Sequence, residues 1–214
     1  MILCLVTERL RLCRGQTFDA GRQRLIEQAR QAVDAGVDVI QVRERDLEAR
    51  DLTIVVEALV AVSRGTATRV VVNDRLDVAL ASGADGVHLR SDSMAAADVR
   101  ALAPAPFLIG RSVHSVDEAT AAGAVDYLIA GTVFPTASKP AGHAVIGLDG
   151  LRAIAAATAV PVLAIGGVTL DRIEVLAGSG AGGVAAIGLF SGPEPVDAVV
   201  RAARSRFDSA RAAS

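Results

Sequence analysis

Polar side chains of the kinds that bind anions, metals or protons follow apolar runs at several points along the chain. Arginine and lysine bind phosphate groups, carboxylates bind metal ions, and histidine carries protons near neutral pH. These residues are Gln41, Arg43 and Arg45; Asn73 and Asp74; His88, Arg90 and Asp92; Arg111, Ser112 and His114; and Thr136, Ser138, Lys139 and His143.

The cations among them are the first clue to a ligand. Arg43, Arg45, Lys139 and Arg90 would direct positive charge at one cavity, although the formal net charge of the chain is −2. A substrate with one or two phosphate groups is the natural partner for such a cluster. Solvated surface charge is the alternative, as for most arginines of the chain.

Two glycine-containing turns indicate where a phosphate would bind. Gly166 and Gly167 follow one apolar run, and Ile187 and Gly188 end the next. Backbone N–H groups without a side chain beside them can approach a phosphate closely. The glycines would also suit tight turns that bind nothing.

Asn73 and Asp74 could hold a divalent metal through oxygen atoms. An aspartate at this kind of junction also often caps a helix, and Asp77 could do the same. His88 lies inside an apolar run and is interpreted as structural. His143 lies in a long loop, where it either closes over a ligand or lies on the surface.

The stretch LIGRSVHSVDEA, residues 108–119, places a histidine between a strand and a helix. Ser115 and Glu118 form a capping-box pattern that predicts the start of the helix. Side chains alternate along a strand, so Ser112 and His114 are expected to face the pocket. Arg111 would point the other way, as a structural residue. His114 is therefore the candidate proton carrier.

Short apolar runs alternate with helical patterns along the chain and predict eight buried parallel strands. One helix is expected over 22–36, where apolar residues recur on one face. The strands are expected at 2–7, 39–43, 69–73, 86–89, 107–112, 127–133, 161–166 and 183–189.

This alternation, with no linker, predicts an α/β fold: a TIM (β/α)8 barrel as a single domain over residues 1–214. The alternative is an open doubly wound sheet, but no G-x-G-x-x-G motif follows the first strand. In a barrel the carboxyl ends of all strands meet at one rim, where chemistry takes place. The polar residues would therefore come together.

Composition narrows the partners. Apolar residues make up 51% of the chain, aromatic residues only 3%, and the charges nearly balance. The sequence therefore predicts no nucleic-acid partner and no membrane partner. Two cysteines without metal-ligand spacing suggest a reduced, cytoplasmic protein. The apolar amino-terminal run is too short for a signal peptide or a membrane span. A homo-oligomer is left open.

Five collinear segments resemble the thiamine phosphate synthase/TenI superfamily, over about residues 39–190. The superfamily is known for the TIM barrel and for two chemistries. The synthase joins hydroxymethylpyrimidine diphosphate to a thiazole phosphate with Mg²⁺ and releases diphosphate. The tautomerase of the TenI group shifts a proton on a thiazole carboxylate phosphate without metal. The segments are QVRER (41–45), VVNDRLDVALASGADGVHL (71–89), GRSVHSVDEA (110–119), DYLIAGTVFPTASK (126–139) and PVLAIGGVT (161–169).

Matches to the synthase concern its substrates and its metal. The resemblance gives Asp74 the role of a metal ligand, with Asn73 beside it, and Ser112 a contact on the diphosphate side. Gln41 and Arg43 match pyrimidine-diphosphate contacts, and Thr136, Ser138 and Lys139 match the T-x-T-K loop.

Departures from the synthase pattern favour the tautomerase. Ser93 stands where the second metal-binding aspartate of the synthase is expected, next to Asp92, and Arg90 replaces a glycine. Arg45 replaces a lysine, Gly188 replaces a serine, and GRSVHS matches the TenI form.

The prediction is thus a TenI-type thiazole tautomerase with catalytic His114 and no cofactor, acting on a small phosphorylated thiazole. The alternative is a thiamine phosphate synthase with Mg²⁺ on Asp74 and a pyrimidine diphosphate as second substrate. A third possibility is a regulator that binds thiazole or thiamine phosphates without turnover. The expected binding residues are Gln41, Arg43, Arg45, Asn73, Ser112, Thr136, Ser138, Lys139, Gly166, Gly167, Ile187 and Gly188.

Overall fold

The computed structural model describes residues 1–13, 15–103, 106–136, 142 and 144–212. Strands and helices alternate along these residues. In chain order they are β1 (Ile2–Val6), α1 (Arg9–Leu12), α2 (Phe18–Asp34), β2 (Val39–Val42), α3 (Ala49–Ser63), β3 (Arg69–Asn73), α4 (Leu76–Ala81), β4 (Gly86–Leu89), α5 (Ala96–Leu102), β5 (Leu108–Val113), α6 (Val116–Thr120), β6 (Tyr127–Gly131), α7 (Gly147–Ala156), β7 (Val162–Ile165), α8 (Ile173–Gly178), β8 (Gly183–Ala186) and α9 (Val196–Ala212), with 3₁₀ turns η1 (Leu170–Arg172) and η2 (Gly188–Phe190).

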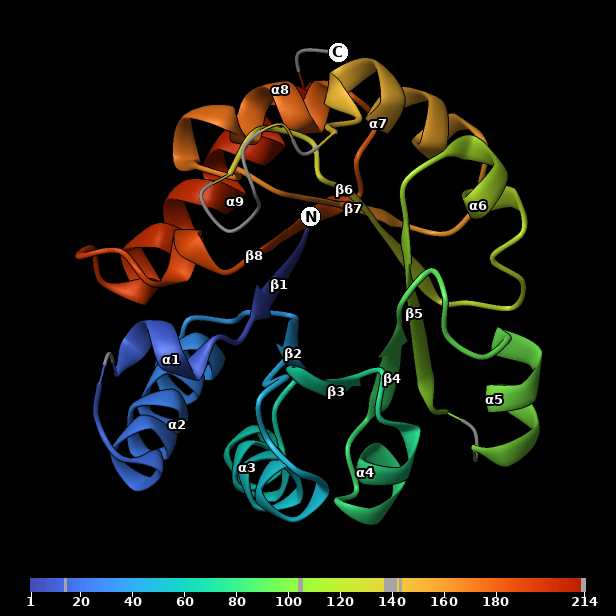
Figure 1. The fold of residues 1–214 in the computed structure, drawn as a ribbon. Helices are drawn as coiled ribbons and strands as arrows, with labels where there is room; N and C mark the ends of the chain where they lie inside the picture. The colour runs from blue at the N-terminus through green and yellow to red at the C-terminus, as the bar shows by residue number, and fades with distance from the viewer. Residues whose placement is uncertain (14, 104–105, 137–141, 143, 213–214) are drawn as a thin grey trace.

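The strands form a closed parallel ring in the order β1 to β8. Each strand pairs with the next, and β8 returns to pair with β1 through Ile2 and Gly183. Helices surround this ring (Figure 1). The predicted TIM barrel is confirmed, and the open doubly wound sheet is wrong because a closed ring has no edge strand.

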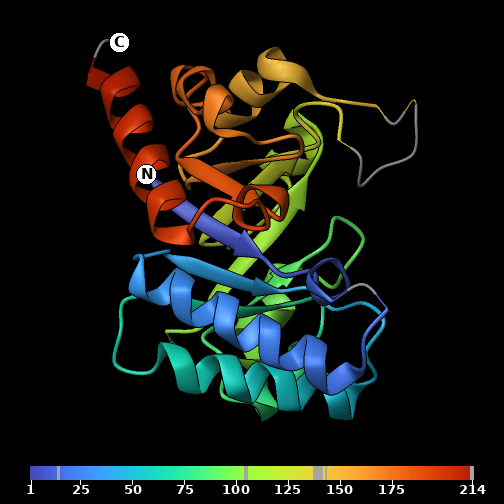
Figure 2. The same ribbon diagram turned by 90° about the vertical axis from the view of Figure 1, so that its left-hand side faces the viewer.

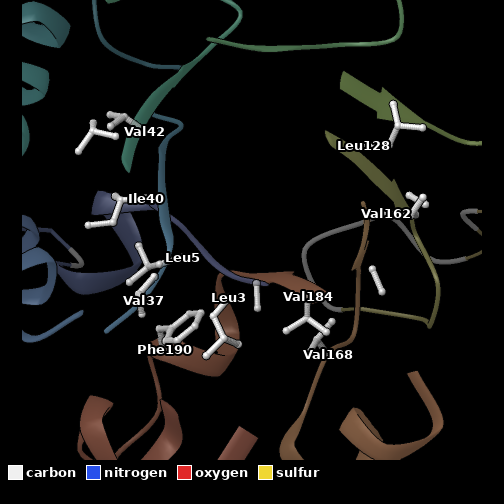
Figure 3. Close-up of a cluster of buried hydrophobic side chains, with 14 of the residues drawn as sticks. Leu3, Leu5, Val37, Ile40, Val42, Leu128, Val162, Val168, Val184 and Phe190 are labelled. Carbon is white, nitrogen blue, oxygen red and sulfur yellow. The ribbon is translucent and has the colours of Figure 1, made fainter. Parts of the chain in front are cut away.

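Alternation along each strand produces two apolar clusters. One fills the inside of the ring with Cys4, Val6, Val39, Val71, Tyr127, Ile129, Leu163 and Ala185. The other lies between strands and helices. Figure 3 shows part of this outer layer, including Leu3, Leu5, Ile40, Val184 and Phe190. Gln41 shares the inner face with Val39, because the two residues are two positions apart on β2.

Several strands end earlier than the apolar pattern predicts, and β6 and β8 do so by the most residues. β6 ends at Gly131, although residues 132 and 133 were expected to continue it. β8 ends at Ala186, and Gly188 already belongs to a 3₁₀ turn. Val133 is nevertheless buried, and Ile187 and Leu189 are partly buried. Burial of side chains beyond the strand ends thus explains why the apolar runs overshoot the strands.

The two long helices are amphipathic. α2 begins at Phe18, four residues before the predicted start, and the Thr17 side chain caps it by accepting a hydrogen bond from the Ala20 N–H. α9 buries one side, including Val199 and Phe207, against the barrel. In the described part of the chain, no helix is long and apolar enough to cross a membrane.

The last helix is tied to the start of the chain. In Figure 2, α9 lies beside β1 and the N-terminus. Arg204 of α9 donates hydrogen bonds to the carbonyl oxygen atoms of Met1 and Gly36, at 3.0 and 2.6 Å, and to Asp38 Oδ2 at 3.0 Å. The same Asp38 oxygen accepts the Leu3 N–H at 2.7 Å. One arginine thus joins α9, β1 and the residues before β2.

Candidate active site

Strand β2 delivers two polar side chains to the inside of the barrel mouth. Gln41 is 2% exposed. No residue that the structure describes offers a hydrogen-bond partner to its buried Nε2. Arg43 follows on the same face and is half-buried, and Arg45 is exposed. An amide without a protein partner is the feature expected of a ligand contact, because unpaired buried polar groups are costly.

Electrostatics at Arg43 favour an anionic ligand. Burial, and then the neighbouring charge of Arg45, lower the pKa of Arg43, and the carboxylates of Glu8 and Glu44 oppose this shift. A bound phosphate would relieve both unfavourable effects, because it supplies the opposite charge at short range.

A buried network behind β2 holds this segment in place. Thr7 Oγ1 donates a hydrogen bond to Glu44 Oε1 at 2.6 Å and accepts the Arg43 N–H at 2.9 Å. The Arg9 N–H lies 3.0 Å from both carboxylate oxygens of Glu44. Burial raises the pKa of Glu44, and the bonds from Thr7 and Arg9 counteract the shift. Sequence reasoning missed this network because Thr7 and Glu44 are 37 residues apart.

The ends of β3 and β4 bring a carboxylate cluster together. Asp74 has a φ of +63° and accepts a short hydrogen bond from the Ser93 hydroxyl at Oδ1. Its Oδ2 lies 3.5 Å from Arg90 Nη1, and Arg90 Nη2 lies 2.6 Å from Asp92 Oδ2. The guanidinium group therefore lies between two carboxylates. Asn73 precedes them at the end of β3.

Arg111 supports the loop that carries this cluster. Its guanidinium donates to the carbonyl oxygen atoms of Met94, Ser91 and Ser93 at 3.1 to 3.2 Å. The Ser93 hydroxyl accepts the Arg90 N–H at 2.9 Å. The structure therefore agrees with the expectation that Arg111 points away from the pocket and has a structural role.

His88 is buried within the barrel and contacts the candidate site residue Ser112. Its Nε2 lies 2.9 Å from Ser112 Oγ, and its Nδ1 lies 3.3 Å from the Tyr127 hydroxyl. Burial lowers the pKa of His88 to about 3, so the ring is neutral at physiological pH. A neutral imidazole between two hydroxyl groups fits the structural role expected for His88, and it also fixes the Ser112 side chain.

His114 lies at the outer part of the rim. Its side chain is 52% exposed, and its Nδ1 lies 3.0 Å from Glu118 Oε2. The same carboxylate accepts the His114 N–H at 2.7 Å, while Ser115 caps α6 by accepting the Glu118 N–H. The capping-box prediction is thus half right, because the glutamate bonds His114 and not Ser115. His114 also lines a cleft of about 480 Å³ with Gly131, Ala144, Val145, Ile146 and Gly150.

The loop after β6 is only partly described. Thr136 is partly buried two positions after Phe134. Ser138, Lys139 and His143 lie outside the described residues, so their predicted roles stay predictions.

The turn after β7 has a structural requirement for glycine. Gly166 and Gly167 have φ values of +98° and +63°. A Cβ atom at Gly166 would lie 2.4 Å from Thr132 Cγ2, and one at Gly167 would lie 2.8 Å from both Phe134 Cβ and the Pro135 carbonyl oxygen. Packing alone accounts for these two glycines.

Gly188 has more space around it. It follows the partly buried Ile187 and is exposed. The nearest atom to a Cβ there would be Arg11 Nη2, at 3.6 Å. Packing therefore does not demand a glycine at this position. The nearby guanidinium, which sequence reasoning missed, adds a cation beside the expected phosphate position.

The donor atoms at the end of β3 fit a magnesium ion. Mg²⁺ is usually held by one or two carboxylates together with phosphate oxygens of a substrate. Asp74 and Asp92 present such a pair, and the Arg90 guanidinium contacts one oxygen of each. In the described residues no three histidine, cysteine or acidic side chains form a metal cluster. Substrate oxygens would have to complete the coordination.

Fold and rim together define a (β/α)8 barrel with charged side chains at the carboxyl ends of its strands. The family model described as thiamine monophosphate synthase (TMP-TENI) matches residues 10–190. The chain belongs to this family.

Relatives match over most of their length. A thiamine-phosphate synthase of Methanoregula boonei is 44% identical over 188 residues, which cover 86% of this chain and 87% of that one. One of Moorella thermoacetica is 37% identical, with coverages of 89% and 92%. The solved thiamine phosphate pyrophosphorylase of Pyrococcus furiosus has a TM-score of 0.81 and 34% identity, covering 98% of this chain and 96% of that chain. The superfamily resemblance is confirmed, and these names favour the synthase over the tautomerase.

Proposed function

We propose that the protein is a thiamine-phosphate synthase, which joins hydroxymethylpyrimidine diphosphate to a thiazole phosphate and releases diphosphate. The observation that carries the proposal is the pair of carboxylates, Asp74 and Asp92, around one cation position at the barrel mouth. A proton shift on a thiazole would have no use for such a pair. The names of the relatives support the same choice.

The pyrimidine diphosphate would bind on the side of β2 and β5. The unpaired amide of Gln41 suits a polar edge of the pyrimidine ring. Arg43 and Arg45 suit the diphosphate, and the lowered pKa of Arg43 means that an anion would stabilise its charged form. The Ser112 hydroxyl, held by His88, suits a contact on the diphosphate side.

The thiazole phosphate would bind at the ends of β7 and β8. Backbone groups of Gly166, Gly167, Ile187 and Gly188 are suited to its phosphate. Thr136 would contribute from the loop after β6, together with Ser138 and Lys139.

Charge stabilisation is the main task of the site. When the carbon–oxygen bond to the diphosphate breaks and the carbon bonds to the thiazole, negative charge accumulates on the departing diphosphate. Mg²⁺ held by Asp74 and Asp92 would neutralise part of that charge. Arg43 and Arg45 are placed to neutralise more of it and to orient the diphosphate.

Asp74→Asn provides the direct test. Asparagine keeps the shape of the side chain and tolerates the positive φ, but it lacks the charge that binds the metal. Purified protein should form thiamine phosphate from the two coupling partners only with Mg²⁺. The variant should lose roughly 10²–10³-fold in kcat, the usual cost of removing one group that stabilises transition-state charge. Product formation is measured by chromatography.

Asp77→Asn is the matched control, since Asp77 is exposed and pairs with Arg75. It should retain wild-type turnover. The proposal fails if wild-type protein makes no thiamine phosphate with Mg²⁺, or if Asp74→Asn retains full activity. Binding of both substrates without any turnover would favour the regulator.

The TenI-type tautomerase is the second candidate, and the contact between His114 and Glu118 favours it. A carboxylate at Nδ1 selects the tautomer with its proton there and leaves Nε2 as the basic nitrogen. The adjoining cleft could admit a thiazole carboxylate phosphate. Such a site would work without metal. The same purified protein should therefore also be assayed for tautomer conversion with a chelator present.

A further inference from the structure

We propose that Arg90 sets the affinity of the protein for Mg²⁺, because its guanidinium occupies the cation position between Asp74 and Asp92. This inference rests on the proposed synthase function, and it concerns a residue of the loop after β4. In the free protein the arginine competes with the metal. It must leave both carboxylates before they can bind an ion.

Contacts in the loop show how the position is filled. Arg90 Nη1 lies 3.5 Å from Asp74 Oδ2, and Arg90 Nη2 lies 2.6 Å from Asp92 Oδ2. The other oxygen of Asp74 is taken by the Ser93 hydroxyl. One cation thus bridges the two carboxylates, and a second cation at that point would be repelled by the first.

The loop is held while the arginine side chain can move. Arg111 anchors the backbone at Ser91, Ser93 and Met94. The Arg90 side chain is 48% exposed, so it can rotate into solvent without disturbing the core. Displacing the Arg90 side chain therefore breaks two partly exposed ion pairs and leaves the core packing unchanged.

Displacement also gives Arg90 a second task. A diphosphate drawn to the metal brings negative charge to the same side of the mouth. The released guanidinium can then pair with it, together with Arg43 and Arg45, in the forked geometry that arginine forms with phosphate. Metal and diphosphate therefore bind better together than the metal does alone.

Arg90→Gln tests the competition directly. Wild-type and variant proteins, without substrates, are titrated with Mn²⁺ alone, and free Mn²⁺ is followed by electron paramagnetic resonance. The variant should bind Mn²⁺ roughly threefold to tenfold more tightly, in keeping with the modest strength of exposed ion pairs. Adding Asp74→Asn to the Arg90→Gln variant should remove the gain, which locates the ion.

Arg69→Gln is the matched control. Arg69 lies at the other end of β3 and pairs with Asp85, so its loss changes the net charge equally but leaves the mouth intact. Its Mn²⁺ affinity should equal that of the wild type. Equal or weaker Mn²⁺ binding in Arg90→Gln, or the same gain in Arg69→Gln, would overturn the inference.

Formation of thiamine phosphate by the wild-type protein separates this inference from the proposed function. If the wild type turns over with Mg²⁺ but Arg90→Gln does not change the Mn²⁺ affinity, the inference about Arg90 is wrong and the proposed synthase function stands. If the wild type shows neither turnover nor Mn²⁺ binding, the inference and the proposed function are both wrong.

Discussion

Burial distinguishes His88 from His114. His88 is 2% exposed and bonded at both ring nitrogens, whereas more than half of the His114 side chain reaches solvent. A general acid–base residue must be within reach of its substrate and must exchange protons with water. His114 meets these conditions, and His88 meets neither.

His114→Gln distinguishes the two chemistries at this residue. The proton-carrying imidazole is lost while a polar side chain remains. If the protein is a synthase, thiamine phosphate formation should stay within about twofold of wild type, as for most surface substitutions away from charge stabilisation. Steady-state rates with Mg²⁺ measure this.

Tautomer conversion is the companion readout for the same variant. A tautomerase would lose roughly 10²–10⁴-fold, the usual contribution of a general acid–base group. Glu118→Gln serves as a control, since it keeps the imidazole and removes only its carboxylate partner. A large loss of coupling activity in His114→Gln would contradict the synthase assignment of this position.

At the scale of elements, the turns after β7 and β8 use glycine for different reasons. Gly188→Val should fold normally, because the surroundings of Gly188 leave room for a side chain. It should nevertheless weaken thiazole phosphate binding roughly tenfold or more, because backbone contacts to a charged group are lost. Gly167→Ala should lower the free energy of unfolding by at least about 1 kcal/mol, because of its positive φ and the neighbouring backbone. Calorimetry and KM for the thiazole phosphate separate the two effects.

A Gly188→Val protein with wild-type KM would place the phosphate elsewhere. A Gly167→Ala protein of unchanged stability would show that the turn can rearrange.

The sequence predicts the order of the elements well and their ends less well. Apolar runs mark every strand, because both faces of a parallel barrel strand are buried. Two of these runs continue past the strand ends, into the buried Val133 and the partly buried Leu189, so the predicted strands are too long there. In the structure, alternation places Gln41 on the same face of β2 as Val39, which lies inside the ring.

Contacts between elements could not be predicted from the sequence. His88 meets Ser112 only because β4 and β5 pair in a register that places His88 opposite Gly110. Similarly, Glu44 reaches Thr7 across neighbouring strands, and Arg90 reaches Asp74 between the ends of β3 and β4. Strand register and loop conformation determine these contacts. Neither can be predicted from residue types and their spacing along one chain.

At the scale of the whole molecule, His88 links folding to pH. Its pKa falls from the ordinary 6.5 to about 3 through burial, so below pH 6.5 the unfolded chain binds a proton that the folded protein does not. The stability due to the neutral ring is complete above pH 6.5 and declines as pH falls toward 3, by up to about 1.4 kcal/mol per pH unit. Glu44, with a raised pKa, acts in the opposite direction.

Comparison with His88→Gln isolates the histidine, because Glu44 is common to both proteins. Urea unfolding at pH 7.5 and 5.5 should show the wild type losing about 1.4 kcal/mol more than the variant between these values. Parallel pH profiles of the two proteins would mean that His88 is not kept neutral by the fold.

The bond network of Arg204 has a consequence for synthesis of the chain. β1 is translated before its partner β8, and α9, whose Arg204 bonds Met1 and Asp38, is translated after β8. On the ribosome, one edge of β1 therefore stays unpaired until β8 has been translated. A product truncated before β8 would leave that edge open to other nascent chains, and α9 then holds the closed ring through Arg204.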